Sequence, residues 1–264
     1  IENRIHPLAF DDVSNILTRG GTILGSSNKS DPANFCVGTD GAGQPIYEDV
    51  SQRVIDHARS HSLDAIICIG GDGTMSGAAK LAEHGLKLVG APKTIDNDLM
   101  GTEVTFGFHT AVGIATEALD RIHTTASSHH RVMLVEMMGR NAGWLTLYAG
   151  LASGADIILI PEIPFSPDVV AGRCVARSKH GRSYTIIAVA EGAKPIGGEV
   201  VVDRVVRDSP DPIRLGGVSE VLCEQIAERT GLECRATILG HVQRGGTPCA
   251  YDRVLGTQFG HHAL

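Results

Sequence analysis

Apolar and polar positions follow two alternating patterns from about Asp64 to the end of the chain. Short β-branched runs, apolar at nearly every residue, predict strands over 65–69, 87–90, 131–136, 156–160, 184–190 and 236–239. Longer stretches with helical spacing lie between them, over 74–84, 110–123, 141–150, 167–180 and 217–230. Fully apolar strands are typical of a sheet covered on both faces. The alternation therefore predicts right-handed βαβ units, a doubly wound parallel sheet and an α/β fold.

The two ends and one internal segment depart from this pattern. Residues 26–47 are dominated by Gly, Asn, Asp, Ser and Pro, which predicts a loop. The chain begins at Ile1 without Met and stops inside a helix-like stretch, 251–264, so we expect a fragment. Its 264 residues suffice for one large domain or two lobes with a real core.

The charge and cysteine content narrow the function classes. A net charge of -7 provides no basic field that would recruit nucleic acid or an anionic membrane. No apolar run approaches the length of a spanning helix, and we expect no signal peptide. None of the six cysteines forms a C-x-x-C pair, which favours a reducing, cytoplasmic setting. An anionic substrate would need a local cluster of Arg and His.

The first candidate for chemistry is the turn Gly70-Gly71-Asp72-Gly73-Thr74, between a buried strand and a helix. Glycines let the backbone approach a phosphate closely, and the helix N-terminus supplies free N–H groups. Asp72 beside a polyphosphate is suited to hold Mg²⁺. A plain strand-to-helix turn with an Asp cap fits this motif equally well when it is taken alone.

A second motif, 92–98, places Asp96 and Asp98 two residues apart after a strand. One carboxylate can face a metal and the other an acceptor hydroxyl, which is the division that phosphoryl transfer requires. An Asx-turn is the alternative, because Asp and Asn favour turns. A third motif, 137–143, carries Arg140 from a strand into a helix.

A scattered basic set completes the candidates: His129, His130, Arg131, Arg235, His241 and Arg244. Arg forks match phosphate oxygens with paired hydrogen bonds. A structural ion pair explains any one of them, whereas phosphate binding explains the set better. Ligands of doubly wound sheets lie at the carboxyl ends of the strands, where we expect every one of these motifs to converge.

Taken together, these residues resemble one family, the phosphofructokinases. The matching stretches occur in the family's order from about Asn15 onward: GGDGT at 70–74, PKTIDNDL at 92–99, SSHHRVMLVEMMGR at 127–140, AEGA at 190–193 and RATILGHVQRGG at 235–246. The resemblance implies transfer of a phosphoryl group from ATP to the 1-hydroxyl of fructose 6-phosphate. It also implies two doubly wound, mostly parallel lobes, a donor lobe over 1–107 plus 243–264 and a sugar-phosphate lobe over 108–242.

The resemblance also assigns roles to individual residues. Asp72 and Asp98 would bind Mg²⁺. Asp96 would be the general base, and Thr94 and Arg140 would steady the transferring group. The donor site would comprise Gly71, Asp72, Gly73, Thr74 and Lys93. The sugar-phosphate site would comprise Thr94, Asp96, Asp98, Arg131, Met138, Gly139, Arg140, Glu191, Arg235, His241 and Arg244.

In the family, the arginines that correspond to Arg131 and Arg235 come from a neighbouring subunit, which implies a homodimer or homotetramer with shared active sites. Several departures from the family pattern matter. The usual first strand with its glycine-rich turn and the last strands are missing, so we expect residues 1–264 alone to show weak activity or none. No Arg follows Leu24-Gly25-Ser26. Arg19 fits the bacterial effector pocket but His123 replaces an expected Arg, so effector control does not follow.

The donor depends on two positions. Gly73 leaves room for the α-phosphate of a nucleotide, where pyrophosphate enzymes often carry Asp. Lys93 is typical of pyrophosphate enzymes, whereas the common bacterial ATP enzymes have Gly. We favour ATP, with pyrophosphate as the alternative.

Two other classes of protein fit the sequence less well. NAD kinases and diacylglycerol-type lipid kinases share GGDGT but not TIDND, MGR and HVQRGG together. A non-catalytic subunit is opposed by the intact Asp72, Asp96, Asp98 and Arg140.

Overall fold

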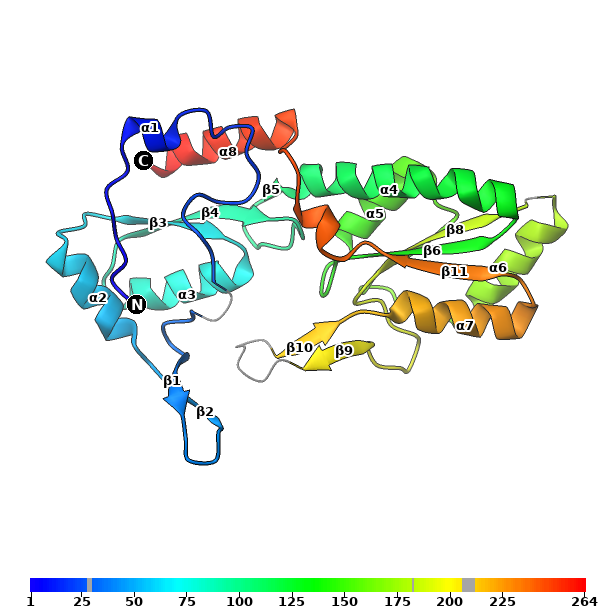
Figure 1. Ribbon diagram of the computed structural model, residues 1–264, viewed down its shortest axis with the longest axis horizontal. Coiled ribbons are helices and arrows are strands. Elements are labelled where there is room, and N and C mark those ends of the chain that lie inside the picture. Colours follow the sequence, from blue (N-terminus) through cyan, green and yellow to red (C-terminus); the bar gives the residue numbers. More distant parts are fainter. Residues whose placement is uncertain (28–29, 182, 206–211) are drawn as a thin grey trace. The chain divides into compact units, whose positions relative to one another are not determined.

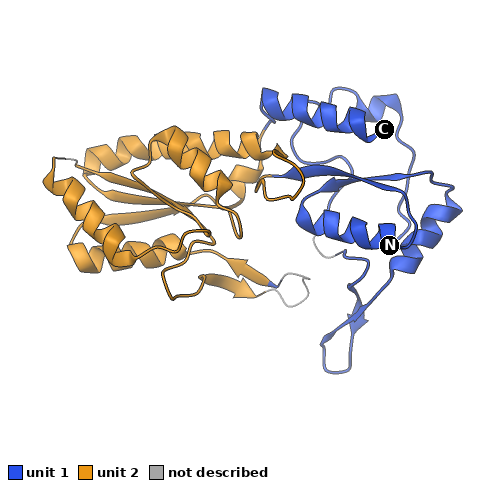
Figure 2. Ribbon diagram, turned by 180° about the vertical axis from the view of Figure 1, so that it is seen from behind, with its two compact units in different colours: residues 1–94, 206–212, 247–264 blue, residues 95–205, 213–246 orange. Residues whose placement is uncertain are grey.

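The computed structural model describes residues 1–27, 30–181, 183–205 and 212–264. The chain forms two compact units (Figure 2). Unit 1 comprises residues 1–94, 206–212 and 247–264, and unit 2 comprises 95–205 and 213–246. The resemblance placed the lobe boundaries near 107 and 243 instead. The assignment of the lobes to donor and sugar phosphate stays a prediction.

Unit 1 is built around two parallel strands. Its elements are α1 (Phe10–Val13), β1 (Phe35–Thr39), β2 (Pro45–Glu48), α2 (Ser51–Ser60), β3 (Ile66–Gly70), α3 (Asp72–Glu83), β4 (Leu88–Thr94) and α8 (Ala250–Ala263). Strands β3 and β4 pair in register from Ile66 opposite Leu88 to Gly70 opposite Pro92 (Figure 1). Helix α3 packs on both strands and α8 packs on β4. The connection β3–α3–β4 is thus a βαβ unit, as the sequence pattern indicated.

The strands of unit 1 are less buried than their apolar sequence suggested. Ile67, Ile69 and Val89 are 37%, 49% and 38% exposed. Ile67 and Ile69 are two residues apart and therefore lie on the same face of the sheet. Within residues 1–264, the described elements of unit 1 therefore leave part of this face of β3 exposed, where the strand pattern predicted cover on both faces.

The segment 26–47, expected to be a loop, contains most of a β-hairpin. Strands β1 and β2 pair antiparallel, with Phe35 opposite Glu48 and Thr39 opposite Pro45. The Asp40 carboxylate accepts hydrogen bonds from the N–H groups of Ala42 and Gln44, both at 2.8 Å, and so closes the turn. The Asp-Gly pair at 40–41 was the available signal. It was masked by the Gly, Asp and Pro residues around it.

Unit 2 contains a four-stranded sheet covered by helices. Its elements are β5 (Phe106–Gly107), α4 (Phe108–His129), β6 (Val132–Met137), α5 (Trp144–Ser153), β7 (Ile157–Leu159), α6 (Pro167–Lys179), β8 (Thr185–Ala190), β9 (Val202–Val205), β10 (Ile213–Leu215), α7 (Val218–Thr230), β11 (Cys234–Ile238) and η1 (Gly240–Arg244). The strand order is β11-β6-β8-β7, and every pair is parallel. The predicted α/β class with parallel sheets is confirmed.

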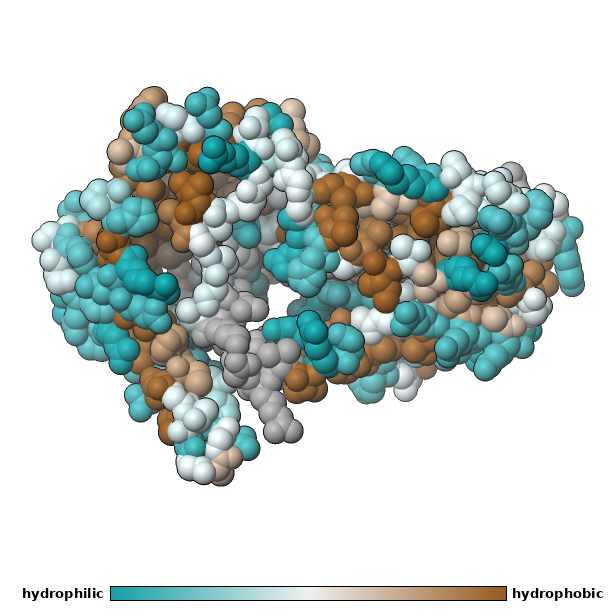
Figure 3. All heavy atoms as spheres, viewed as in Figure 1, coloured by the Kyte–Doolittle hydropathy of each residue, from teal (hydrophilic) through white to brown (hydrophobic). Residues whose placement is uncertain are grey.

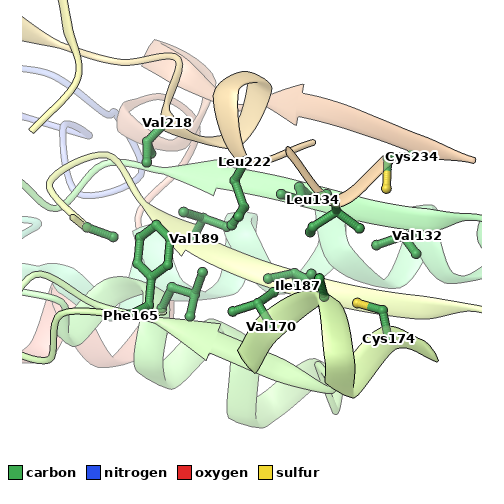
Figure 4. Packing of buried hydrophobic residues seen from close by; sticks show 14 residues of the cluster. Val132, Leu134, Phe165, Val170, Cys174, Ile187, Val189, Val218, Leu222 and Cys234 are labelled. Atoms are coloured by element: carbon green, nitrogen blue, oxygen red, sulfur yellow. The ribbon is translucent and has the colours of Figure 1, made fainter. Parts of the chain in front are cut away.

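The two central strands, β6 and β8, are buried at each of their six positions. Leu134 and Ile187 pack on the side of α6 and α7, where Leu222 and Val170 point toward them (Figure 4). The alternate residues face α4 and α5 and form a second core. Each fully buried aliphatic side chain contributes about 1.5–3 kcal/mol. The core of this unit therefore fixes the ends of β6 and β8, from which the candidate site residues extend.

The outer surface carries hydrophobic residues among hydrophilic ones. Figure 3 shows this mixture on the face of each unit that it draws. One exposed apolar group, Trp144, Tyr148 and Leu151, lies on a single side of α5 at helical spacing. Within the described residues, no helix combines the length and apolarity needed to cross a bilayer.

Candidate active site

The donor-site residues of unit 1 lie at one end of its sheet. Since Gly70 pairs with Pro92, the turn after β3 lies beside the last residues of β4, Lys93 and Thr94. These two residues belong to the strand rather than to the loop that the motif suggested. Helix α3 starts at Asp72 and exposes its first turn, and its N-cap residue, Gly71, has no side chain that could cap it. An exposed helix N-terminus beside a lysine is suited to bind phosphate oxygens.

The acidic loop of unit 2 is shaped by Asn97. This residue has a left-handed backbone conformation, with φ of 53°. Its Oδ1 accepts a hydrogen bond from the Thr105 N–H at 2.8 Å, and its Nδ2 donates to the Glu103 carbonyl at 3.4 Å. Asn97 thereby holds the loop in shape between Asp96, which is partly buried, and Asp98, which is exposed. The sequence left an Asx-turn open as the alternative here, but these bonds of Asn97 run six and eight residues ahead, so they shape the whole loop rather than a single turn.

The residues expected to bind Mg²⁺ are divided between the units, Asp72 in unit 1 and Asp98 in unit 2. Among the described residues there is no cluster of three or more His, Cys, Asp or Glu that could hold a metal. Mg²⁺ bound with a nucleotide typically takes one or two carboxylates and completes its shell with phosphate oxygens and water. Each of these carboxylates, taken in its own unit, is a hard oxygen donor of the kind that this mode of binding uses.

The loops after β6 and β8 are joined at the carboxyl end of the unit 2 sheet. The Glu191 N–H donates to the Met137 carbonyl at 2.8 Å, and the Gly192 N–H donates to the Gly139 carbonyl at 3.1 Å. A Cβ on Gly192 would lie 1.9 Å from the carbonyl oxygen of Arg140, so only glycine permits this approach. The contact brings Met138, Gly139 and Arg140 together with Glu191, as the resemblance implied.

Glu191 has a perturbed acidity. Burial raises its pKa to about 7, and the negative charges of Glu136 and Asp96 act in the same direction. A hydrogen bond from the Gly139 backbone and the charge of Arg140 oppose the rise without cancelling it. A carboxyl group that titrates near neutral pH in a polar loop cluster is typical of a functional site.

Two further candidates extend the same edge of the sheet. Helix η1 follows β11, and the Leu239 N–H that leads into it donates to the Glu136 carbonyl at 3.0 Å. His241 and Arg244, both on η1, are exposed. Because β11 neighbours β6, these bases lie next to the Arg140 loop. Three adjacent strands thus end in candidate site residues.

Arg131 and Arg235 lie at the opposite end of the sheet. Arg131 immediately precedes β6, and Arg235 is the second residue of β11, opposite Met133. Both donate to the Glu233 carboxylate, at 2.9 and 2.7 Å. The expectation that every motif lies at the carboxyl ends was therefore wrong for these arginines, since each stands where its strand begins. Within this chain they form the ion pair that the sequence left open as an alternative.

One buried polar residue was not among the expected site residues. Glu136 lies within the apolar strand β6, is 1% exposed, and accepts hydrogen bonds from Gly217 and Ser219. An acid in the run Val132–Met137, whose other members are all apolar, was the available signal. Its partners lie more than 80 positions along the chain, so the sequence did not indicate them.

Comparison with known proteins identifies the family of this chain. A family model described as phosphofructokinase matches residues 1–264, and so begins earlier than the Asn15 that the motifs indicated. The chain belongs to the phosphofructokinase family. The resemblance drawn from its motifs is thereby confirmed.

Similar proteins of the phosphofructokinase family are named for two different phosphoryl donors. The chain is 51% identical over 261 residues to an ATP-dependent 6-phosphofructokinase 2 of Clostridium perfringens, covering 97% of this chain and 70% of that protein. It is 52% identical over 259 residues to a pyrophosphate–fructose 6-phosphate 1-phosphotransferase of Amycolatopsis methanolica, covering 98% and 72%. Identity at this level does not distinguish the donors.

A solved structure of a phosphofructokinase is also similar. The phosphofructokinase of Saccharomyces cerevisiae matches with a TM-score of 0.75 and 32% identity. The match covers 97% of this chain and 34% of the yeast chain, so this chain spans about a third of that protein's length. The likeness supports the α/β architecture of the family over almost all of the present residues.

Proposed function

We propose that this chain is the catalytic body of a 6-phosphofructokinase, which transfers a phosphoryl group from ATP to the 1-hydroxyl of fructose 6-phosphate. One observation carries the proposal. Three neighbouring parallel strands of unit 2 end in Arg140, in Glu191 and in the His241–Arg244 segment. This reaction requires a cation beside the transferring phosphoryl group, a hydrogen-bond acceptor for a sugar hydroxyl, and positively charged side chains for the sugar phosphate.

The chemistry follows from these residues. Asp96 takes the proton of the 1-hydroxyl as the sugar oxygen bonds to the γ-phosphorus, while the bond from that phosphorus to the bridging oxygen breaks and ADP leaves. Thr94 and Arg140 stabilise the charge on the transferring group. Glu191 accepts a hydrogen bond from a sugar hydroxyl, and His241 and Arg244 bind the 6-phosphate. Magnesium held by Asp72 and Asp98 would neutralise charge on the donor phosphates.

Gly73 supports ATP as the donor, because glycine adds no side chain that would crowd or repel the α-phosphate of a nucleotide. It lies on the exposed first turn of α3. Pyrophosphate is the second candidate, because Lys93 is exposed at the end of β4 and can bind a short polyanion directly. The names of the two similar proteins, at nearly equal identity, keep this alternative in place.

The experiment is a donor comparison on the complete gene product, with fructose 6-phosphate and Mg²⁺ and with ATP or pyrophosphate offered separately. Activity with ATP alone supports the proposal. Activity with pyrophosphate alone replaces it with a reversible phosphotransferase. Gly73→Asp is the matched variant: it should abolish use of ATP by crowding and repelling the nucleotide, and it should leave any use of pyrophosphate largely intact.

The positions of Arg131 and Arg235 support a shared active site. Strand β6 has six residues, so its two ends are roughly 17 Å apart at 3.3 Å per residue. A hexose phosphate held at the carboxyl end by Arg140 and Glu191 is too short to reach both arginines of its own chain. If they bind the 6-phosphate, they bind that of a second copy. We therefore propose a homodimer or homotetramer in which each site uses two chains.

A further inference from the structure

Glu136 occupies a position that the strand pattern reserves for an aliphatic side chain. In β6 it shares a face with Val132 and Leu134, both of which lie in the core covered by α6 and α7. Its side chain is 1% exposed. Burying a carboxylate costs several kcal/mol unless hydrogen bonds compensate it. The bonds of Glu136 therefore define where its partners must lie.

All three of these bonds come from the start of α7. One carboxylate oxygen of Glu136 accepts from the Gly217 N–H at 2.9 Å. The other accepts from the Ser219 N–H at 2.9 Å and from the Ser219 hydroxyl at 2.7 Å. Gly217 is the N-cap of α7 and has no side chain that could cap the helix. Glu136 thus caps this helix from a neighbouring strand, where the helix dipole favours a negative charge.

These bonds from Gly217 and Ser219 to Glu136, called the clamp below, are linked through β10 to Arg140. Only Gly216 and Gly217 separate the end of β10 from α7, so holding Gly217 also holds β10. The carbonyl of Ile213, on β10, accepts a hydrogen bond from the Arg140 Nη1 at 3.3 Å. Arg140 follows Glu136 by four residues on the loop after β6. Glu136 is therefore connected to the guanidinium of Arg140 in two ways. One is along the chain through the loop after β6, and the other is through its hydrogen bonds to the start of α7 and the adjoining strand β10.

We propose that Glu136 is a positioning residue for phosphoryl transfer, which acts through Arg140 by fixing β10 against the loop that carries it. This inference rests on the proposed function, in which Arg140 stabilises the transferring group. Glu136 itself is enclosed by the sheet and α7 and does not touch the substrates.

Glu136 also influences Glu191, which provides a second readout. Burial is the largest cause of the raised pKa of Glu191; the Gly139 backbone hydrogen bond and Arg140 lower it, while the charges of Glu136 and Asp96 raise it. Removing the charge of Glu136 should therefore move the titration of Glu191 to lower pH. This shift would follow from removal of the charge alone, so the dependence of kcat on Arg140 is what separates positioning from a purely structural role.

The test uses the complete enzyme, with Glu136→Gln compared against Glu228→Gln, which changes an exposed acid on α7, the helix that Glu136 caps. At saturating concentrations of both substrates, Glu136→Gln should lower kcat by about 10-fold or more, since Arg140 loses its alignment. In a plot of kcat/KM for fructose 6-phosphate against pH, the fall on the acidic side should move to lower pH. The Glu228→Gln control should match the wild type. A Glu136→Gln enzyme with wild-type kcat and pH profile would overturn the proposal.

A double-mutant cycle separates action through Arg140 from a general effect. In an Arg140→Ala background, Glu136→Gln should lower kcat far less than it does in the wild type. An equal loss in both backgrounds would overturn the proposal. If Glu136→Gln does not fold, Ser219→Ala replaces it, because that variant removes one donor and keeps the carboxylate. Its smaller loss of kcat should depend on Arg140 in the same way, and the absence of any loss would count against the proposal.

Hydrogen exchange distinguishes failure of this inference from failure of the proposed function. The amides of residues 213–219 should exchange faster in Glu136→Gln, or in Ser219→Ala if that variant is needed, than in the wild type. Unchanged exchange would overturn the clamp, whatever reaction the enzyme catalyses. A wild-type protein inactive with both donors would instead remove the proposed function while leaving the exchange result valid for the clamp.

Discussion

At the scale of single residues, Asp96 is the expected general base. It lies in a loop that Asn97 holds in shape through its bonds to Thr105 and Glu103. Asp96→Ser should lower kcat by about 10²- to 10⁴-fold and change the KM for fructose 6-phosphate little, because the base acts in the transition state. Steady-state kinetics on the complete enzyme measure both constants. The exposed Asp120 of α4 supplies the control, Asp120→Asn. An unchanged kcat in Asp96→Ser would remove this residue as the base.

Glu191 leads to a prediction about pH. Its pKa of about 7 means that the carboxylate, the better hydrogen-bond acceptor for a sugar hydroxyl, is lost as pH falls from 8 to 6. The KM for fructose 6-phosphate should rise over this range. In Glu191→Gln the same change in pH should have a much smaller effect. Equal pH dependence in both enzymes would exclude Glu191 as its source.

The same group makes a linked contribution to stability. The pKa of Glu191 is raised in the folded state, so its contribution to stability is present below about pH 4.5 and is lost as pH rises through about 7. The wild type should therefore lose free energy of unfolding as pH rises from 5 to 8, and Glu191→Gln should not show this loss. The difference in free energy of unfolding between Glu191→Gln and the wild type should thus shift in favour of the variant over this range. Denaturant titrations at the two pH values measure this difference.

At the scale of elements, the amino ends of β6 and β11 form a separate basic edge. Glu233 holds Arg131 and Arg235 side by side, and the buried Nε of Arg131 has no hydrogen-bond partner among the described residues. Arg235→Ser should raise the KM for fructose 6-phosphate by roughly 10- to 100-fold, the loss expected for a charged hydrogen bond. Its kcat should change little. Arg121→Ser, which breaks an exposed ion pair on α4, is the control. A defect confined to kcat would contradict phosphate binding by Arg235.

At the scale of the whole molecule, the opposite placement of Arg140 and Arg235 predicts complementation between chains. Arg140→Ala and Arg235→Ser enzymes should each be weakly active at low substrate concentration. Unfolded and refolded together in equal amounts, they should regain about a quarter of wild-type activity, because half of the random dimers are mixed and each mixed dimer has one intact site. No recovery, with mixed oligomers verified by mass, would mean that both arginines act within their own chain.

The sequence by itself determined the parts of this protein that depend on local pattern. The runs of β6 and β8, apolar at nearly every residue, predicted buried parallel strands, and the glycine-rich turn at 70–74 predicted the exposed start of a helix, α3. These features follow from residue spacing alone, so they could be predicted without any partner. The family could be predicted for the same reason, since each of its motifs is a short run of consecutive residues.

Only the tertiary structure decided which end of a strand each residue occupies and what a buried polar group bonds. The strand pattern placed Arg131 and Arg235 at the carboxyl ends of their strands, but both stand where their strands begin. Glu136 was hidden in an apolar run, and its partners are 81 and 83 positions away. Contacts at that separation depend on how strands and helices pack, because neither hydrophobic period nor local turn chemistry specifies which distant segment meets a given side chain.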